Sequence, residues 1–559
     1  MSDAPTTEPP AAAATAPRNS FGWAALGIVI AAGGLRLWGL ELGLPHLEAR
    51  PDETETLRLT VDAAGGSFDF DWAIYPHAYV YLQWAWAELV LLVQSWLGLV
   101  ATGDMEHVWR SEPERLYAIG RWLSALAGTA TVVVVLATAR RELGATVALI
   151  AGAWLAVNLL HVRESHALKP DILLSLGLAA CLAAAASLAR RRDVTSAIAA
   201  GAAVGAASAM KYNGVLGALP VCVGAWMGAR DASGLRRWLP ASLVVAGASA
   251  VGAFALANPF LLSNEAAHAV VQGNLHAVFP DLIDAPRAVP DIDMSRPEGP
   301  GMPDWVAPYG GFSALVYHFG FSFWHGVGAV ATLLAPVAVG FGLRSKRALL
   351  RVSAVFALAW FVVIALSPVT LSRYVTPMLP ALAILQAALI CELAGRFAPA
   401  RASLAAALVA LLVLAQPALA SVRFDQLAAR SDTRAEALRW LAANARGARV
   451  AVVGTRFWHW GEPRLPQTAT RVALPAAGRV DRRAVDYLVT HDHELYWSEI
   501  PDGFLERNAG RLELLVDLDP RDGAEGSPVF EPNDAYYIPI SGFAGVSAPG
   551  PHVRIYRVR

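Results

Sequence analysis

The stretch FGWAALGIVIAAGGLRLWGLELG (residues 21–43) predicts a membrane-spanning helix, because it is apolar and long enough to cross a bilayer. EARPDETETL (48–57) follows it and carries Glu48, Asp52, Glu53 and Glu55. Ionisable groups at a membrane margin are costly to desolvate and are usually kept for function. The start of the chain therefore predicts a membrane span followed by an acidic cluster at the membrane surface.

The composition of the whole chain also indicates a membrane protein. Of its 559 residues, 55% are hydrophobic and 16% are charged, and the mean hydropathy is +0.42. Soluble proteins carry roughly 25% charged residues. A net charge of −1 gives no reason to expect nucleic acid as a partner. Cys181, Cys222 and Cys391 lie in apolar runs, which speaks against a disulfide framework.

Eleven apolar segments are predicted to span the membrane as helices. They lie near 21–43, 115–138, 143–161, 171–189, 195–210, 213–229, 239–258, 319–342, 349–367, 374–394 and 402–421.

A twelfth apolar segment, 77–99, is assigned by the distribution of basic residues. If it does not cross, the Arg-rich loops around 140, 190, 236 and 346 share one side of the membrane, as the positive-inside rule expects. We therefore expect 77–99 to lie along the outer face, or dip into it, as an aromatic-rich interfacial helix. The N-terminus is then cytoplasmic, and long outer loops cover 44–114 and 259–318.

Three regions follow from this topology. Residues 1–20 are rich in Ala, Pro and Thr and are predicted to be a disordered cytoplasmic tail. Residues 21–421 form the transmembrane domain. Residues 422–559 are predicted to form a small extracytoplasmic α/β domain, with a helix over 432–447 and strands at 448–454, 485–490, 512–518 and 552–558.

Carboxylates and cations from four loops are predicted to meet on the outer face. Asp52 and Glu53 follow the first span, and Asp171 begins the fourth, whereas Lys211 and Arg373 lie at the margins of later spans. A carboxylate can take a proton from an acceptor hydroxyl as general base. Lys or Arg can neutralise a departing phosphate. The set fits group transfer from a phosphate-linked donor held in lipid.

The motifs resemble the polytopic glycosyltransferases of family 39, which include protein O-mannosyltransferases and lipid A aminoarabinose transferases. The resemblance rests on LRLWGL…RPDE, YPHAYVYL, GRWLSALAGTATVVVVLATARRELG, HVRESHALKPD, MKYNG and RYVTPMLP, in this order. It implies an all-α polytopic membrane protein of the C-type glycosyltransferase fold, with about eleven spans, an interfacial helix and the C-terminal α/β domain. It also implies a polyprenyl-phosphate-sugar donor and inversion at the anomeric carbon, in a bacterial plasma membrane.

The resemblance also implies roles for individual residues. Asp52 matches the catalytic carboxylate with Glu53 as its neighbour, and Asp171 matches a second acidic position. Lys211 and Arg373 match basic positions near the donor phosphate. His77 stands where some relatives carry a Lys–Pro pair that contacts the lipid phosphate.

Two histidines of the outer loops, His161 and His166, are candidates for binding a metal ion or phosphate; an ordinary hydrogen-bonded histidine is the alternative. A divalent metal ion is a candidate cofactor, with no ligands assigned. The acceptor is left open among protein, lipid and polysaccharide.

Each of these charged residues could instead have a purely structural role. Asp52 could cap a helix, with Glu55 completing a capping box, and Asp171 could cap the fourth span. Lys211 and Arg373 could be snorkelling anchors. The rival function for the whole chain is a glycolipid transporter or flippase, which would place its charges near the bilayer midplane within repeated halves.

Overall fold

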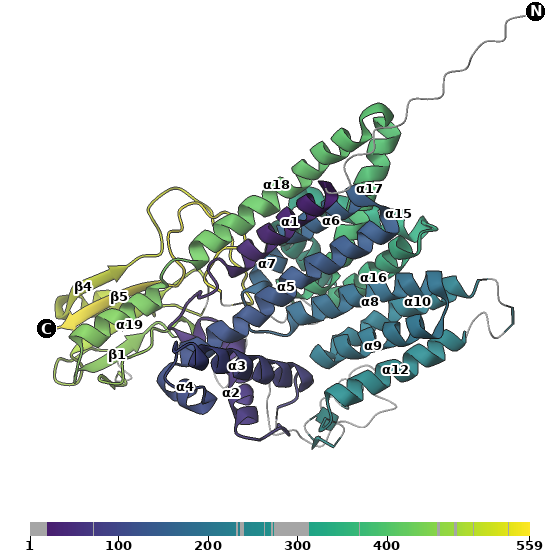
Figure 1. The fold of residues 1–559 in the computed structure, drawn as a ribbon. Helices are drawn as coiled ribbons and strands as arrows, with labels where there is room; N and C mark the ends of the chain where they lie inside the picture. The colour runs from purple at the N-terminus through teal and green to yellow at the C-terminus, as the bar shows by residue number, and fades with distance from the viewer. Residues whose placement is uncertain are drawn as a thin grey trace, which may run out of the picture.

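A computed structural model describes residues 20–559, apart from 71, 231–232, 235–239, 262, 266, 270–271, 273–311, 368, 456–458, 475–477, 496 and 535. It is a large helical domain followed by a small α/β domain (Figure 1). The helices of the first domain are α1 (Ser20–Leu37), α2 (Pro51–Ala64), α3 (Ala78–Trp96), α4 (Met105–Ser111), α5 (Pro113–Leu143), α6 (Ala145–Ala156), α7 (Leu159–Ser165), α8 (Asp171–Arg191), α9 (Val194–Met210), α10 (Ala218–Gly228), α12 (Ala241–Ala257), α14 (Phe312–Tyr317), α15 (Ala329–Arg344), α16 (Ala348–Ala365), α17 (Leu379–Phe397) and α18 (Ala402–Ala428).

The helical domain is an integral-membrane bundle. Among the described residues, 6 helices are long and apolar enough to cross a membrane, or up to 8 if each of two bent helix pairs counts as one span. Every predicted span contains a helix, but α9 and α12 have only 17 residues each and α10 has 11. The mostly helical membrane fold is thus confirmed, whereas the count of eleven crossings stays a prediction.

The two ends of the bundle carry different segments. Helices α2, α3 and α4 lie at the end that also carries the C-terminal domain, and the connection between α17 and α18 lies at the opposite end (Figure 1). This arrangement places the 44–114 region and the C-terminal domain together, as the predicted topology requires. Helix α3 packs against α2, α4 and α5 and is not among the candidate spans, which agrees with an interfacial position.

A buried arginine stabilises the break between α6 and α7, where the chain bends by 57°. Helix α6 ends at Ala156, which leaves carbonyl groups without helical partners. The Arg36 guanidinium of α1 donates to the carbonyl oxygens of Leu155 (3.1 Å) and Ala156 (3.0 Å). The Asn158 side chain caps α7 by accepting from the backbone N–H of His161. The sequence 159–171 is thereby turned toward the C-terminal domain.

The C-terminal domain is a five-stranded mixed sheet of order β2-β1-β3-β5-β4. Its strands are β1 (Arg449–Val453), β2 (Thr470–Arg471), β3 (Tyr487–Asp492), β4 (Leu512–Leu518) and β5 (His552–Val558), and β1 runs parallel to β2 and β3 while β5 is antiparallel to β3 and β4.

Helix α19 (Thr433–Asn444) covers one face of this sheet. Its Ala437 and Leu441 pack on Val450, Val489 and Ile555. The other face is covered by a second apolar cluster that includes residues near α20 (Phe504–Asn508).

The structure does not show the two helix-capping alternatives that the sequence left open. The capping box at Asp52 and Glu55 is absent: α2 starts at Pro51, its N-cap Arg50 makes no side-chain cap, and Glu55 pairs instead with Arg58. Asp171 is likewise not a cap, because it is the first residue of α8 after the N-cap Pro170.

The last helix of the bundle is longer than predicted. Helix α18 continues to Ala428, past the predicted span end at 421. The tail 1–19 and most of the predicted loop 259–318 lie outside the described residues.

Candidate active site

Asp52 lies in the first turn of α2 and faces two cations from distant parts of the chain. Its Oδ2 is 3.0 Å from Lys169 Nζ and 3.1 Å from Arg373 Nη2. Lys169 lies in the loop between α7 and α8, and Arg373 in the 3-10 helix η5 (Ser372–Met378) before α17. The side chain of Asp52 keeps 38% of its surface exposed, whereas Lys169 and Arg373 keep 3% and 12%. The cluster therefore presents one accessible carboxylate held by two enclosed cations.

The neighbouring Glu53 points elsewhere and ties three segments together. Its carboxylate is fully buried against Arg121 of α5, with Oε2 2.6 Å from Nη2. Its Oε1 accepts the backbone N–H of Leu168 at 2.8 Å, and Arg121 also donates to the carbonyl oxygens of Leu40 and Leu42. Glu53 thus fixes the first turn of α2 against the loop that carries Lys169.

A second carboxylate reaches the same cations from the C-terminal domain. Asp534 Oδ2 is 3.3 Å from Arg373 Nη1 and 3.2 Å from Arg163 Nη2, and its Oδ1 is 4.0 Å from Lys169 Nζ. Glu531 accepts from Arg163 at 2.7 Å and from the backbone N–H of Ser372 at 2.6 Å. The C-terminal domain therefore supplies part of this ionic cluster.

Tyr536 fixes that segment to the helical domain. Its ring lies between two guanidinium groups, with Arg50 Cζ and Arg163 Cζ each 3.9 Å from the ring centroid. Its hydroxyl accepts from Arg50 at 2.8 Å and donates to Glu164 at 3.4 Å. Desolvated cation–π contacts contribute about 2 kcal/mol each. Asn533 adds a hydrogen bond of 2.6 Å to the carbonyl oxygen of Thr370.

A second ion pair lies beside the first. Lys211, which follows α9, places Nζ 2.9 Å from Asp171 Oδ1 at the start of α8. The same ammonium is 5.2 Å from the ring centroid of Tyr75 and 5.7 Å from that of Tyr374, which is next to Arg373. Lys211 also contributes to stabilising the charge of Asp52. The predicted residues Asp52, Asp171, Lys211 and Arg373 are thus brought into one electrostatic neighbourhood.

The electrostatics of this cluster favour ionised groups. Burial raises the pKa of Asp52, but the positive charges of Lys169 and Arg373 outweigh burial and hold that pKa well below its usual range. Burial and the positive charge of Arg373 lower the pKa of Lys169, and Asp52 and Asp534 reverse these effects, so that the pKa ends above its usual value. The pKa of Lys211 is raised in the same way by Asp171, against burial.

The three predicted histidines lie in different surroundings from this cluster. His77 is buried at the start of α3 with its ring edge-on to Phe70, 5.0 Å between centroids. His161 is buried and accepts from Arg36 at 2.9 Å, and His166 contacts the carbonyl oxygens of Val162 and Trp38. These contacts indicate structural roles and lend no support to phosphate or metal binding.

No group of three or more His, Cys, Asp or Glu side chains in the described part of the chain is placed to hold a metal ion.

Five residues of this cluster were not among the predicted site residues: Arg163, Lys169, Glu531, Asp534 and Tyr536. Lys169 and Arg163 belong to the motif HVRESHALKPD, so the motif itself was the available signal. The remaining three come from a C-terminal stretch with no pattern that indicates a contact more than 300 residues away along the chain.

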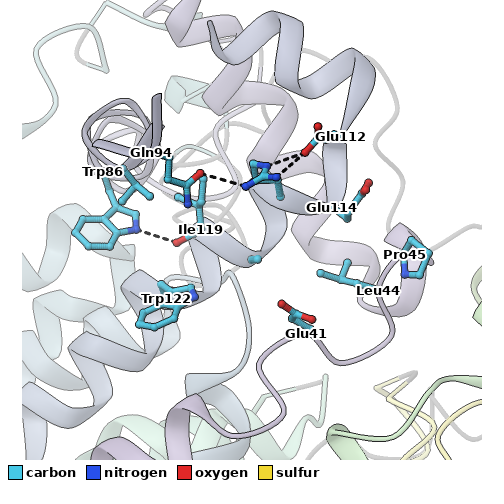
Figure 2. Close-up of a pocket in the computed structure, with 12 residues that line it drawn as sticks. Glu41, Leu44, Pro45, Trp86, Gln94, Glu112, Glu114, Ile119 and Trp122 are labelled. Atoms are coloured by element: carbon cyan, nitrogen blue, oxygen red, sulfur yellow. Dashed lines mark hydrogen bonds and ion pairs between the residues drawn. The ribbon is translucent and has the colours of Figure 1, made fainter. Parts of the chain in front are cut away.

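A separate pocket of about 790 Å³ opens between α3 and the start of α5. Figure 2 shows Trp86, Ile119 and Trp122 on one side of the pocket and Glu41, Glu112 and Glu114 on the other, so that apolar and acidic side chains share the lining. The Trp86 indole N–H donates to the carbonyl oxygen of Ile119 at 2.8 Å. None of the residues of the Asp52 cluster lines this pocket. The pocket is therefore a separate cavity and not part of that cluster.

Comparison with known proteins agrees with the motifs. Residues 118–262 match the family described as dolichyl-phosphate-mannose-protein mannosyltransferase. This match confirms the resemblance to glycosyltransferase family 39 over the part of the chain that carries Lys169, Asp171 and Lys211. No protein with a curated function matches the chain.

The fold is similar to several solved structures. ArnT from Cupriavidus metallidurans bound to undecaprenyl phosphate is 16% identical, with a TM-score of 0.48, covering 96% of this chain and 98% of that one. The Archaeoglobus fulgidus oligosaccharyltransferase tethered with an acceptor peptide is 12% identical, with a TM-score of 0.47, over 85% and 69% of the chains. The S. cerevisiae Pmt1-Pmt2 complex bound to the sugar donor is 19% identical, with a TM-score of 0.33, over 45% and 34%.

Proposed function

We propose that this protein transfers a sugar from a polyprenyl-phosphate-linked donor to an acceptor hydroxyl on the extracytoplasmic side of a bacterial plasma membrane. The observation that carries the proposal is Asp52, an accessible carboxylate held by the enclosed cations Lys169 and Arg373 at the end of a membrane bundle. The family match over residues 118–262 supports a lipid-phosphate-linked sugar as the donor class.

Asp52 is the proposed general base. Its carboxylate is ionised at neutral pH, because the flanking cations lower its pKa. It is also the accessible member of its ion-pair cluster, so an acceptor hydroxyl can approach it. Such a base contributes typically about 10²- to 10⁴-fold to a rate.

Lys169, Arg373 and Lys211 are proposed to hold the donor phosphate. A guanidinium offers paired N–H donors that match a phosphate, and an ammonium supplies a compact positive charge. Positive groups fixed before the reaction stabilise the negative charge that the leaving phosphate acquires. Asp171 is proposed to hold Lys211 in place through their 2.9 Å contact.

In the proposed step one bond forms and one bond breaks at the anomeric carbon. The acceptor oxygen bonds to the anomeric carbon from the face opposite the phosphate, and the bond between that carbon and the phosphate oxygen breaks. Its electron pair stays on the phosphate oxygen, while the acceptor proton passes to Asp52. The products are the glycosylated acceptor, with inverted configuration, and the polyprenyl phosphate; Asp52 then releases its proton to water.

The position of the charges favours this reaction over transport. Asp52 lies in the first turn of α2, Asp171 at the first residue of α8 and Lys211 just beyond the last residue of α9. Transporters usually hold their substrates near the bilayer midplane between repeated halves. A site formed at helix ends and closed by a C-terminal domain suits chemistry at the membrane surface.

The test is sugar transfer by the purified protein in lipid vesicles. Polyprenyl-phosphate-linked sugars are supplied singly, each with one class of acceptor (protein, lipid or polysaccharide), and the glycosylated acceptor and the free polyprenyl phosphate are measured by mass spectrometry. Asp52→Asn should lower the rate by about 10²-fold or more and still insert into the membrane. Asp62→Asn is the matched control, since Asp62 lies on the same helix in a surface pair with Arg58.

Transfer that continues in Asp52→Asn would remove Asp52 as the base. Movement of intact donor across the vesicle membrane, without release of polyprenyl phosphate, would support the flippase alternative.

A further inference from the structure

Asp52 and Asp534 both contact the same two cations, Lys169 and Arg373. Arg373 binds Asp52 through Nη2 at 3.1 Å and Asp534 through Nη1 at 3.3 Å. Lys169 lies 3.0 Å from Asp52 and 4.0 Å from Asp534. One carboxylate comes from the helical domain and the other from the C-terminal domain, so the two domains share these cations.

Asp534 is held firmly in this place. It is 7% exposed, and the contacts of Glu531 with Arg163 and of Tyr536 with Arg50 lie on either side of it in the chain. The bond from Asn533 to Thr370 adds a further anchor. These contacts fix the backbone on both sides of Asp534 beside the cations.

The charges of the cluster balance without a ligand. Four positive groups, Arg50, Arg163, Lys169 and Arg373, face four negative ones, Asp52, Glu164, Glu531 and Asp534. A donor phosphate that enters adds negative charge to a neutral cluster. Either a carboxylate must give up its contact with a cation, or the phosphate must share that cation.

We propose that Asp534 is a positioning residue that shares the charge of Lys169 and Arg373 with Asp52 and yields it to the donor phosphate. The inference rests on the proposed function and adds the C-terminal domain to the site. Because Lys169 and Arg373 also contact Asp534, they stabilise the Asp52 carboxylate less than they would alone. Asp52 is therefore a stronger base when Asp534 is present. When phosphate arrives, it takes over the contacts of Asp534, while Asp52 stays in place for the acceptor.

The proposal predicts opposite changes in binding and in turnover for Asp534→Asn. The cluster then has a surplus positive charge, so a phosphate should bind more tightly, by about tenfold. Both cations then act on Asp52 without competition, which makes it a weaker base. The kcat should therefore fall, by about threefold or more, while the KM for the donor also falls. Loss of a merely structural contact would raise the KM or reduce the amount of folded protein.

The experiment measures binding of undecaprenyl phosphate to the full-length protein in detergent micelles, together with kcat and KM for transfer. Asp534→Glu keeps the charge and should restore values near those of the natural protein. Asp502→Asn, an exposed residue of the same domain, is the control and should change neither quantity. Asp534→Ser removes the same charge and replaces Asp534→Asn if that variant is not recovered in folded form.

Tighter binding with slower turnover, restored by Asp534→Glu, supports the inference. Unchanged or weaker binding in a folded variant that lacks the charge overturns it and leaves the proposed function standing. A natural protein that does not bind undecaprenyl phosphate at all overturns the inference together with the proposed function.

Discussion

Glu53 gives the sharpest test of how the site is held together, because it adjoins the proposed base but is fully buried against Arg121. In Glu53→Gln the negative charge is lost and the shape is kept. Arg121 then retains the carbonyl oxygens of Leu40 and Leu42 as acceptors. The positive charge of Arg121 then stays buried without a carboxylate beside it. The amide group of the glutamine faces Arg121 or the backbone N–H of Leu168.

Breaking a buried ion pair from one side costs about 3–5 kcal/mol. Because Arg121 keeps its carbonyl acceptors, we expect Glu53→Gln to lower the free energy of unfolding by about 3 kcal/mol, at the lower end of this range. For a chain of 559 residues that unfolds as one unit, a change of that size corresponds to a fall in Tm of about 2–3 °C, since the unfolding entropy is about 2.1 cal/mol/K per residue. Glu55→Gln is the matched control on the same helix: its pair with Arg58 is at the surface, with side chains 36% and 43% exposed. The free energy of unfolding of that variant should fall by about 0.3–0.5 kcal/mol.

Thermal unfolding in detergent, followed by the loss of monodisperse protein, measures both variants. The double variant Glu53→Leu/Arg121→Met should recover much of the lost stability, because similar-sized apolar residues can replace a buried pair. If Glu53→Gln unfolds at the same temperature as the natural protein but does not transfer sugar, Glu53 acts in the chemistry and the anchoring role is wrong.

Three further predictions concern the cations, the pH and the domain contact. Arg373→Lys should raise the KM for the donor by about tenfold, because one ammonium cannot replace the two guanidinium nitrogens that face Asp52 and Asp534; an unchanged KM in a transfer assay would contradict this. The lowered pKa of Asp52 keeps its base form present down through pH about 5, and its contribution to stability is lost only as the pH falls through the lowered pKa. Initial rates should therefore show no acidic limb between pH about 5 and 7, and a midpoint near pH 6 would assign the base to another group. Tyr536→Phe should keep the ring between Arg50 and Arg163, whereas Tyr536→Ala should lower the free energy of unfolding by about 1–4 kcal/mol; equal Tm values for the two variants would argue against the cation–π contacts.

The fold could be predicted from the sequence wherever one segment carries its own signal. Apolar length identified the helices of the bundle, and alternation identified the strands at 448–454, 485–490, 512–518 and 552–558, which correspond to β1, β3, β4 and β5. Strand β2 was missed because it contains only Thr470 and Arg471, both exposed. A strand of that length has no pattern of its own and exists through its pairing with β1.

The site could be predicted only in part, because its ion pairs join residues far apart in the chain. Asp52 and Arg373 stood out as charges beside apolar segments, and the structure brings them together. In the sequence Glu53 is also a charge beside an apolar segment, like Asp52. The structure separates the two, because Glu53 is buried in an ion pair with Arg121. Asp534 lies in an ordinary polar stretch, so its contact with Arg373 depends on how the whole C-terminal domain folds.

The docking of Glu531, Asp534 and Tyr536 onto the helical domain has a consequence for biosynthesis. These residues follow all of the membrane helices and four of the five strands in the chain, so a nascent chain contains Arg163, Lys169 and Arg373 long before Glu531 and Asp534 are made. The site is therefore completed late, when the last domain has folded onto helices already in the bilayer. Until then these three cations face only two carboxylates, Asp52 and Glu164, and the surplus positive charge is one that anionic lipid headgroups or a chaperone could cover.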